Sequence, residues 1–400
     1  MLKMEGGSAW LLYAGGALLV LRFILKNVNW LLYEYKLGGK QYFLPPGDMG
    51  WPIIGNMWSF LSAFKTTNPD TFIDSFYSKY GKTGIYKVLM FGNPSVIVTT
   101  PETCKKVLTD DEHFEPGWPR STVELMGEKS FISIPYDEHR RLRRLTSASI
   151  NGYEALSVYI TYIEEVVKSS LEKWSTMGNI EFLTEMRKLT FKVIIHIFLG
   201  AESDVVMENL EKEYTKLNYG VRAMRINLPG FAFHTALKEE QEEMLRKRPP
   251  TQKGLTLAEV RKMEYLSKVV DETMRIITFS LMVFRVTKKD VNINGYLVPK
   301  GWKVMTWFRS VHLDPTIYPN PKEFDPERFN EVRKAGEFLP FGAGTRLCPG
   351  NDLAKLEISV FLHHFLLGYE LEQINPLAPM KFLPHTRPVD NCLARIKKVK

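Results

Sequence analysis

The sequence predicts a mainly α-helical domain with small β-sheets, placed behind an N-terminal membrane anchor. Three observations lead to this prediction. Apolar residues recur at helical spacing over long stretches, a few short β-rich runs are interrupted by Gly, Asn and Pro, and an apolar segment lies near the start of the chain. With 400 residues, 44% of them hydrophobic, the chain is long enough to bury a large core.

Cysteine content and charge narrow the class of protein. Cys104, Cys348 and Cys392 lie far apart without Cys-x-x-Cys spacing, so neither a disulfide framework nor a thiolate zinc site is indicated. A reducing, cytosol-facing compartment fits best. The formal charge of +8 suits an anionic membrane surface or an acidic protein partner. No nucleic-acid partner is expected, because no nucleic-acid motif interleaves with the basic residues.

Residues 1–25 are predicted to form a single transmembrane anchor. The stretch "SAWLLYAGGALLVLRFIL" is apolar except for Arg22, whose long side chain can reach the headgroups from near one end of a helix. Three lysines follow this stretch, which predicts that the bulk of the chain faces the cytosol. A cleaved signal peptide is the alternative, but "RFILKNVNW" stands where a small-residue cleavage site is expected.

The rest of the chain divides into a hinge and a large domain. Residues 26–56 are basic and contain "LPPGDMGWPIIGN", whose prolines and glycines predict a stiff turn between anchor and domain. Residues 57–400 form one domain without internal repeats.

Four stretches define the expected elements of this domain. "GIYKVLMFGNPSVIVTT", residues 84–100, has the β-rich runs and the Gly-Asn-Pro break of a hairpin. Residues 154–174 and 182–199 have the spacing of core helices. Residues 290–307 contain strand runs broken at Asn294-Gly295 and at Pro299-Lys300-Gly301.

The stretch "FLPFGAGTRLCPG", residues 338–350, holds the best candidate for a reactive group. A thiolate can bind iron, and a helix N-terminus favours the thiolate form of Cys348. The residues after Pro349 have the spacing of a long buried helix. A buried, inert cysteine at a glycine-rich turn is the alternative. A dinucleotide-binding loop is disfavoured, because position 347, where a third glycine is expected, is Leu.

Two further stretches bear on this loop. "DETMR" places Glu272 and Arg275 three residues apart on one helix face, and such a pair is usually solvated. "FDPERF" adds Arg328 in a turn shortly before the cysteine loop. Together, Glu272, Arg275 and Arg328 are expected to form a buried, mutually satisfied structural network that holds the loop in place.

Glu-x-x-Arg, Pro-Glu-Arg-Phe and Phe-x-x-Gly-x-Arg-x-Cys-x-Gly, in this order, resemble the cytochrome P450 family of haem-thiolate monooxygenases. The cysteine motif matches at every fixed position, which are Phe341, Gly344, Arg346, Cys348 and Gly350. The resemblance implies a P450 fold and a bound haem b, with Cys348 as the axial ligand of the haem iron, where thiolate ligation favours O–O cleavage.

The resemblance also implies which residues bind the haem and which partners the protein needs. Arg346 and Arg285, together with Arg143 from "HRRLRR", are expected to reach the haem propionates. His139 stands where many members carry Trp and retains a hydrogen-bond donor. The anchor and hinge resemble those of members held on the endoplasmic reticulum membrane, which receive electrons from NADPH through NADPH-cytochrome P450 reductase.

Three stretches resemble one plant subgroup, the ent-kaurenoic acid oxidases of gibberellin biosynthesis and their triterpene-oxidising relatives. They are "LPPGDMGWPIIGN", "FGNPSVIVTTPETCKKVLTDDEHFEPGWP" and "DVNINGYLVPKGWKV". This likeness implies a rigid, apolar, polycyclic terpenoid substrate. By analogy, the pocket is expected within residues 114–134, 277–284 and 383–388, whose apolar content also suits core packing.

One part of the family's plan is not found in the sequence. The family carries a long helix on the distal, oxygen-activating face of the haem with an acid-threonine pair, and no catalytic residue of this kind is identified. "NLPGFAFHTALK" runs directly into "EEQEEMLRKRPP", which predicts an internal deletion near residues 237–239. Asp70-Thr71, the nearest acid-threonine pair, is interpreted as a helix start.

Three functional hypotheses therefore stay open. The first is a membrane-bound terpenoid monooxygenase. The second is a truncated isoform or an imperfect gene model that binds haem with little or no oxygenase activity, because its distal wall and proton delivery are missing. The third is a haem protein that uses peroxide or rearranges a hydroperoxide.

Overall fold

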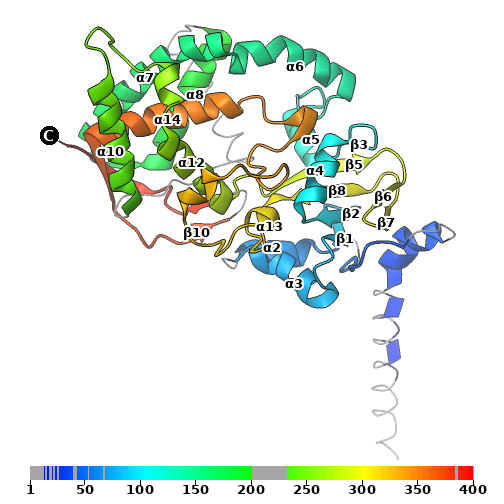
Figure 1. Cartoon of the computed structure of the whole chain (residues 1–400). Coiled ribbons are helices and arrows are strands. Elements are labelled where there is room, and N and C mark those ends of the chain that lie inside the picture. The colour runs from blue at the N-terminus through cyan, green and yellow to red at the C-terminus, as the bar shows by residue number, and fades with distance from the viewer. Residues whose placement is uncertain are drawn as a thin grey trace, which may run out of the picture. The chain divides into compact units, whose positions relative to one another are not determined.

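The computed structural model of the chain describes residues 13, 16–17, 20, 23–24, 27–38, 43–52, 54–65, 68–200, 232–382 and 386–399. Its elements fall into two compact units (Figure 1). Unit 1 comprises Met1–Pro135 and Met282–Trp307, and unit 2 comprises Tyr136–Leu281 and Phe308–Lys400. The expectation of a mainly helical protein with small sheets is confirmed for the described residues.

Unit 1 is built on a five-stranded sheet, counted over the described residues, in the order β1-β2-β8-β5-β3. The strands are β1 (Ile85–Met90), β2 (Asn93–Val98), β3 (Phe114–Pro116), β5 (Met282–Thr287) and β8 (Lys303–Trp307). Among the pairs of this sheet, only β2 and β8 are parallel. β1 and β2 form the expected hairpin. β6 (Val291–Ile293) and β7 (Tyr296–Val298) form a second hairpin, turned by Asn294 and Gly295, both at positive φ.

Helices of unit 1 pack on this sheet through aromatic side chains. The helices of unit 1 include α2 (Met57–Lys65), α3 (Asp70–Tyr80), α4 (Pro101–Thr109) and α5 (Arg120–Met126), with the 3₁₀ turn η1 (Tyr35–Leu37) before them. The aromatic contacts with the sheet come from α2 and α3. The ring of Trp307 in β8 lies 5.5 Å from that of Phe72 in α3 and 6.2 Å from that of Phe60 in α2. These edge and tilted ring contacts fix both helices against the strand.

Unit 2 is mainly helical. Its helices are α6 (Tyr136–Asn151), α7 (Tyr153–Thr176), α8 (Phe182–Leu199), α10 (Ala232–Lys247), α11 (Leu257–Val260), α12 (Glu264–Ile277), α13 (Phe308–His312) and α14 (Asn351–Gly368). Two 3₁₀ turns, η2 (Pro326–Asn330) and η3 (Gly344–Arg346), lie in the connection between α13 and α14. The helices predicted for residues 154–174 and 182–199 correspond to α7 and α8.

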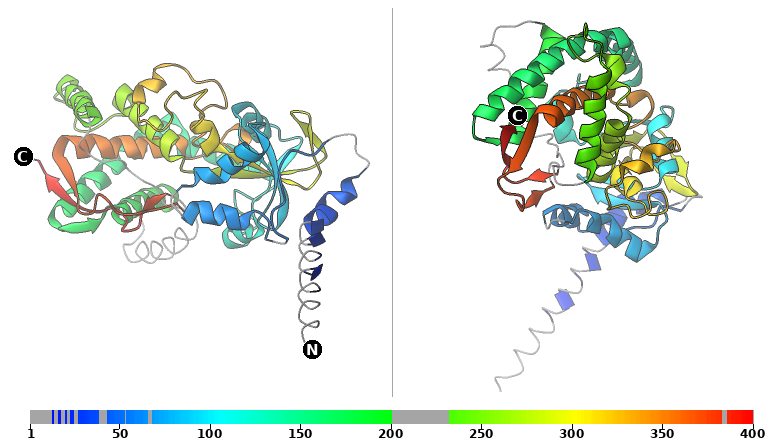
Figure 2. Two further views of the ribbon diagram at one scale, coloured as in Figure 1. Left: turned by 90° about the horizontal axis from the view of Figure 1, so that it is seen from below. Right: turned by 60° about the vertical axis from the view of Figure 1, so that its left-hand side comes forward.

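The core of unit 2 forms where α14 packs against α7 (Figure 2). Leu356, Val360 and Phe361 of α14 and Ile163 and Val167 of α7 belong to one buried cluster. Small sheets border this core, one in the order β4-β12-β9 and one formed by β10 and β11. Their bounds are β4 (Asn179–Glu181), β9 (Tyr369–Gln373), β10 (Met380–Lys381), β11 (Arg387–Pro388) and β12 (Leu393–Lys398).

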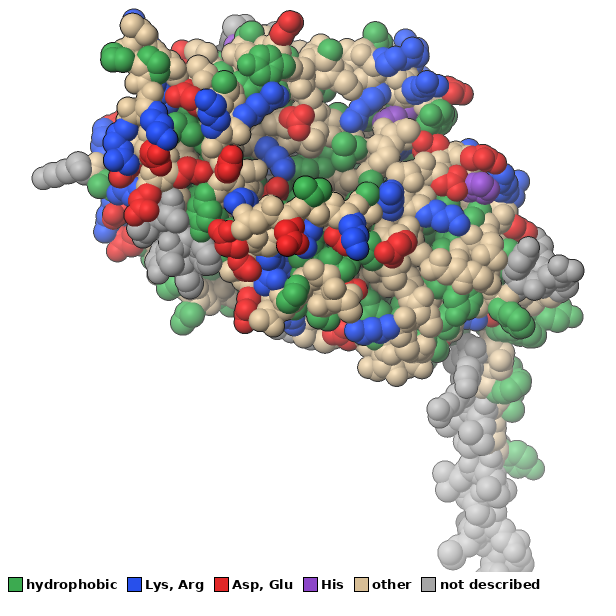
Figure 3. Space-filling model, in the orientation of Figure 1, with side chains coloured by type: hydrophobic (Ala, Val, Ile, Leu, Met, Phe, Trp, Pro, Cys, Tyr) green, Lys and Arg blue, Asp and Glu red, His purple; other side chains and the backbone are tan. Residues whose placement is uncertain are grey.

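Most of the predicted anchor, residues 1–25, and parts of the hinge lie outside the described residues. Within the described parts of the chain, no helix combines the length and the apolar character needed to cross a bilayer. On the face drawn in Figure 3, basic and acidic side chains are interspersed. Elsewhere among the described residues, Lys247 and Glu243 form an exposed ion pair of this kind.

Candidate functional site

The cysteine loop, residues 338–350, is closed by its own backbone. The amide of Cys348 donates to the carbonyl oxygen of Phe341 over 3.0 Å, and the amide of Gly342 donates to that of Leu339 over 3.1 Å. Gly342 and Gly344 have φ of 79° and 71°, in the left-handed region that favours glycine. The loop therefore returns on itself and presents Cys348 just before α14.

Cys348 differs from the other two cysteines in its surroundings. Cys104 and Cys392 are buried, and burial raises the pKa of both thiols, that of Cys392 to about 11. Both are therefore poor sources of thiolate at neutral pH. Cys348 is a free, half-buried thiol three residues before the first residue of α14. Its exposure and its position near a helix N-terminus suit a thiolate ligand of iron.

Gly350 is a second sign that the loop accommodates a bound group. Its φ of −101° is open to any residue, and a Cβ added there would meet no atom within 4 Å. Neither backbone strain nor packing among the described residues therefore requires glycine at this position. The open space beside Gly350 leaves room for a flat ligand to lie against the loop, and the residues present are in this respect compatible with a haem.

One helix, α6, holds the loop on both sides of Cys348. Arg143 donates from Nη1 to the carbonyl oxygen of Leu347, the residue before the cysteine, over 2.5 Å. Asn151, at the end of α6, donates to Oδ1 of Asn351 over 2.8 Å and accepts from the amide of Leu353 over 3.4 Å. The helix α14 has no side-chain cap of its own at Gly350, so Asn151 satisfies one of its free amides.

The other expected haem-binding residues fall in different places. His139 lies in α6 and is buried, with 2% of its surface exposed, and Arg346 lies half-buried at the end of η3. Both belong to unit 2, as do Cys348 and Arg143. Arg285 is buried in β5 of unit 1, where its Nη1 donates to the carbonyl oxygen of Phe284 over 3.3 Å. Contact of these side chains with haem propionates stays a prediction.

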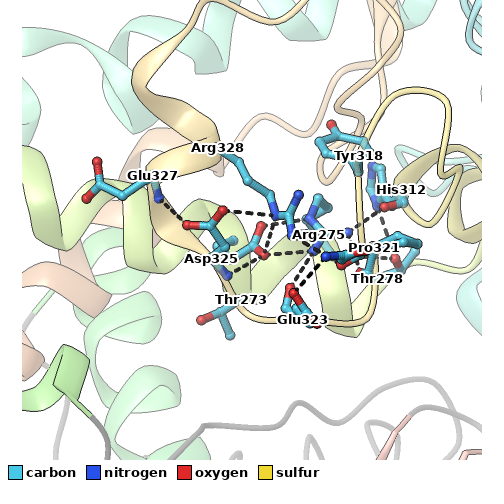
Figure 4. Close-up of polar contacts among 12 residues, drawn as sticks. Thr273, Arg275, Thr278, His312, Tyr318, Pro321, Glu323, Asp325, Glu327 and Arg328 are labelled. Atoms are coloured by element: carbon cyan, nitrogen blue, oxygen red, sulfur yellow. Dashed lines mark hydrogen bonds and ion pairs between the residues drawn. The ribbon is translucent and has the colours of Figure 1, made fainter.

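Glu272 and Arg275, both in α12, form a fully buried ion pair. Figure 4 shows the polar contacts around Arg275. Nε and Nη2 of Arg275 donate to the two carboxylate oxygens of Glu272, each over 2.7 Å. Nη1 of Arg275 donates to the carbonyl oxygens of His312 and Pro321 over 2.7 and 2.8 Å. Nε, Nη1 and Nη2 of Arg275 and both carboxylate oxygens of Glu272 therefore all have hydrogen-bond partners, as a buried charge requires.

Arg328 in η2 completes this group of charges. Its Nε lies 3.4 Å from Oε1 of Glu272, and its Nη2 donates to the carbonyl oxygen of Asn320 over 3.1 Å. The amide of Asp325 donates to the same Glu272 oxygen over 2.9 Å. The structure therefore brings Glu272, Arg275 and Arg328 together, and fastens to α12 the segment that leads into the cysteine loop.

Sequence reasoning did not find His312, which lies between this network and the loop. The ring is fully buried, and its Nε2 accepts the amide of Leu339 over 2.9 Å. A single histidine in the apolar segment before "LDP" carries no signal that separates it from an ordinary core residue. Asn151 was missed for a similar reason, because its partners lie 200 and 202 residues away along the chain.

The expected substrate-contacting segments stay predictions. Residues 114–134 belong to unit 1, residues 277–284 are divided between the two units, and residues 383–385 lie outside the described part of the chain.

A family model described as Cytochrome P450 matches this chain in two segments, residues 45–231 and 232–389. Ent-kaurenoic acid oxidase 2 of Arabidopsis thaliana is 53% identical over 470 aligned positions, which cover 95% of this chain and 96% of the relative. A 7,8-epoxymelianol synthase of Ailanthus altissima is 43% identical over 491 positions, covering 100% of this chain and 99% of the relative.

The alignments with these relatives are longer than the part of this chain that they cover. The alignment with the Arabidopsis protein has 470 positions, and it includes 95% of the 400 residues of this chain, which is 380 residues. About 90 positions of the relative therefore have no counterpart here. The alignment with the Ailanthus protein leaves a similar difference, 491 positions for 400 residues.

The fold agrees with these relationships. Retinoic acid bound cyanobacterial CYP120A1 has a TM-score of 0.72 and 22% sequence identity to this chain, and the match covers 90% of this chain and 100% of that one. This likeness supports the fold alone. The family match and the identities show that the chain belongs to the cytochrome P450 family, whose members are haem-dependent monooxygenases.

Proposed function

We propose that this protein oxidises an apolar polycyclic terpenoid, with ent-kaurenoic acid as the preferred substrate, and that Cys348 is the axial ligand of its haem iron. The observation that carries the proposal is the cysteine loop, in which a half-buried free thiol lies at a turn that leaves space beside Gly350. The names of the relatives supply the substrate class, since the Arabidopsis protein is an ent-kaurenoic acid oxidase.

The residues of this chain have distinct roles in the proposal. Haem, when bound, supplies the activation of dioxygen. The cysteine loop orients the thiolate, while Arg143, Arg346 and Arg285 pair with the haem propionates and His139 donates a hydrogen bond. Electrons come from NADPH through NADPH-cytochrome P450 reductase, and the N-terminal segment holds the protein on the endoplasmic reticulum membrane.

The test uses microsomes that contain the full chain and a plant NADPH-cytochrome P450 reductase. A thiolate-type band in the reduced, carbon-monoxide-bound difference spectrum is expected, together with an NADPH-dependent oxidised product of ent-kaurenoic acid. Cys348→Ala should abolish both. A folded protein whose band is unchanged by Cys348→Ala would refute the ligand assignment.

A second candidate is a shortened P450 that binds haem but turns over little or no substrate. Two observations support it: the family model matches in two segments that meet between residues 231 and 232, and about 90 positions of the Arabidopsis relative have no counterpart. The expected junction near 237–239 lies a few residues further on, within α10. The expectation of a junction near 237–239 stays a prediction, and we propose the boundary at 231–232 between the two matched segments as the insertion point for its test. The segment missing there would include the distal helix of the family.

An insertion distinguishes the two candidates. The chain as given is compared with a chain in which the unmatched residues of the Arabidopsis relative are inserted between residues 231 and 232. The second candidate predicts haem binding in both proteins and product only in the longer one. Equal product from both would contradict it, and turnover that needs peroxide but no reductase would favour the peroxide-using alternative. Sequencing the transcript across this junction then separates an isoform from an imperfect gene model.

A triterpene oxidase is a third candidate, supported by the 43% identity to the Ailanthus 7,8-epoxymelianol synthase. Incubating the same microsomes with ent-kaurenoic acid and with a tetracyclic triterpene, separately and in competition, compares the two substrate classes. Preference for the triterpene would favour this third candidate.

A further inference from the structure

His312 makes two ring hydrogen bonds whose directions define its tautomer. The amide of Leu339 can only donate, so Nε2 of His312 must be the acceptor in this 2.9 Å contact. A neutral imidazole with an accepting Nε2 carries its hydrogen on Nδ1. Nδ1 lies 3.0 Å from Oγ1 of Thr278, so His312 donates to that hydroxyl.

Thr278 connects this ring to the buried ion pair. It ends α12 in the left-handed conformation, with φ of 43°, which is strained for a β-branched residue. Its hydroxyl donates to the carbonyl oxygen of Arg275 over 2.7 Å while it accepts from His312. The backbone carbonyl of His312 in turn accepts from the guanidinium of Arg275 over 2.7 Å. His312 is therefore joined to the end of α12 by both its ring and its backbone.

On its other side, His312 holds the start of the cysteine loop. Leu339 is the residue whose carbonyl accepts the amide of Gly342, so its position determines where the turn begins. The ring of Phe338 lies 5.6 Å from that of His312 and packs against the same side chain. The loop then closes through the bond between Cys348 and Phe341.

We propose that His312, as the neutral Nδ1–H tautomer, is a positioning residue. Its hydrogen bonds fix the position of the Cys348 loop relative to the buried Glu272–Arg275 pair. The inference rests on the proposed role of Cys348 as iron ligand. An ordinary core histidine would contribute stability alone. A positioning residue also determines whether the thiolate loop keeps the geometry that iron ligation needs.

Two substitutions test the hydrogen bonds of the two ring nitrogens of His312 separately. His312→Gln places an amide oxygen near the position of Nε2 and keeps an acceptor for the Leu339 amide. His312→Asn places an amide nitrogen near the position of Nδ1 and keeps a donor toward Thr278, but leaves the Leu339 amide without its partner. If His312 only fills the core, the two variants should be equally impaired.

The first measurement needs no haem. In the full chain with ¹⁵N-labelled histidine, the His312 resonances should report the Nδ1–H tautomer. Hydrogen exchange at the Leu339 amide should be about tenfold or more faster in His312→Asn than in the wild type, with His312→Gln in between, because that amide loses its buried acceptor. The Nε2–H tautomer, or unchanged exchange in His312→Asn, would overturn the proposal.

The second measurement uses the haem-bound chain. The share of thiolate-type band in the reduced, carbon-monoxide-bound spectrum should fall severalfold in His312→Asn and be largely retained in His312→Gln. Equal loss in both variants would refute the positioning role. Cys348→Ala separates this outcome from failure of the proposed function. If the wild type gives a band that survives Cys348→Ala, the ligand assignment fails. The tautomer of His312 and the hydrogen exchange of the Leu339 amide still test the contact between these two residues.

Discussion

Arg143 donates to the carbonyl oxygen of Leu347 over 2.5 Å, directly before Cys348 in the chain. A charged donor bound to the carbonyl oxygen of Leu347 restrains the backbone directly beside the residue that carries the thiol. Hydrogen bonds to charged groups contribute about 1.5–3 kcal/mol. The contact therefore adds to the expected pairing of Arg143 with a haem propionate, since a guanidinium has five N–H donors.

Arg143→Ala should weaken haem retention by roughly tenfold or more, because about 1.5–3 kcal/mol of loop restraint is lost. Transfer of haem to apomyoglobin measures the change. Arg144→Ala is the matched control: it removes the same charge from an exposed position next in the chain, and should leave retention close to that of the wild type. Equal effects of the two variants would mean that charge, not the contact with Leu347, matters.

Asn151→Ala should lower the free energy of unfolding by about 1 kcal/mol, the usual effect of losing a helix cap. Asn151→Asp keeps an acceptor for the Leu353 amide and adds a negative charge near the start of α14, so it should lose less. Urea titration of the two variants, followed by circular dichroism, measures both values. An alanine variant as stable as the wild type would show that the 3.4 Å contact does not act as a cap.

Arg275→Met should destabilise the protein by about 3–5 kcal/mol, because it leaves the carboxylate of Glu272 buried without its main partner. Thermal unfolding and the yield of soluble chain report the loss. Lys247→Met serves as the control, since it breaks the exposed pair with Glu243 and should change stability little. A mild effect of Arg275→Met would indicate that the Glu272 carboxylate is neutral or hydrated.

Glu357 in α14 offers a stabilising substitution. It is 8% exposed, its Oε1 has no hydrogen-bond partner among the described residues, and burial raises its pKa to about 8. Because folding raises the pKa of this carboxyl, the free energy of unfolding of the protein falls as pH rises from about 4.5 towards 8. At pH 7 this loss is on the order of 3 kcal/mol.

Glu357→Gln should therefore stabilise the protein at pH 7 to 8 and change it little at pH 4.5. Urea titrations at these pH values measure the difference, with the exposed change Glu331→Gln as the control. Destabilisation by Glu357→Gln at pH 8 would show that the carboxylate has a cationic partner.

His312 predicts an opposite dependence on pH. Burial, together with the charges of Arg275 and Arg309, lowers its pKa from 6.5 to about 3. Its contribution to stability is complete above pH 6.5 and is lost as pH falls towards 3, because only the unfolded chain binds the proton readily. Between these values the wild type should lose about 1.4 kcal/mol per pH unit more than His312→Gln does. Parallel curves for the two proteins would contradict the lowered pKa.

Much of the fold could be predicted because its signals are local. The apolar spacing of α7 and α8 and the Gly-Asn-Pro break between β1 and β2 are contained in stretches of fewer than 25 residues. The charged members of the network, Glu272, Arg275 and Arg328, could be selected because their motifs recur in a known family.

What the sequence could not provide is the partners of these side chains. Arg275 donates to carbonyl oxygens of residues 37 and 46 positions away, and backbone carbonyls leave no trace in residue type. The tautomer of His312 arises in the same way, from a contact with Leu339, 27 residues further along the chain. Asn151 acts on a helix that begins 200 residues later, so no local pattern marks it as a cap.

Gly350 has a consequence for how substitutions in this chain should be judged. Its backbone angles, and the absence of any described atom within 4 Å of an added Cβ, make alanine acceptable to the described part of the polypeptide. On our proposal, the cost of that alanine comes from the bound haem, a molecule that the gene does not encode. Assays of folding alone will then score such positions as tolerant, while the holoprotein depends on them.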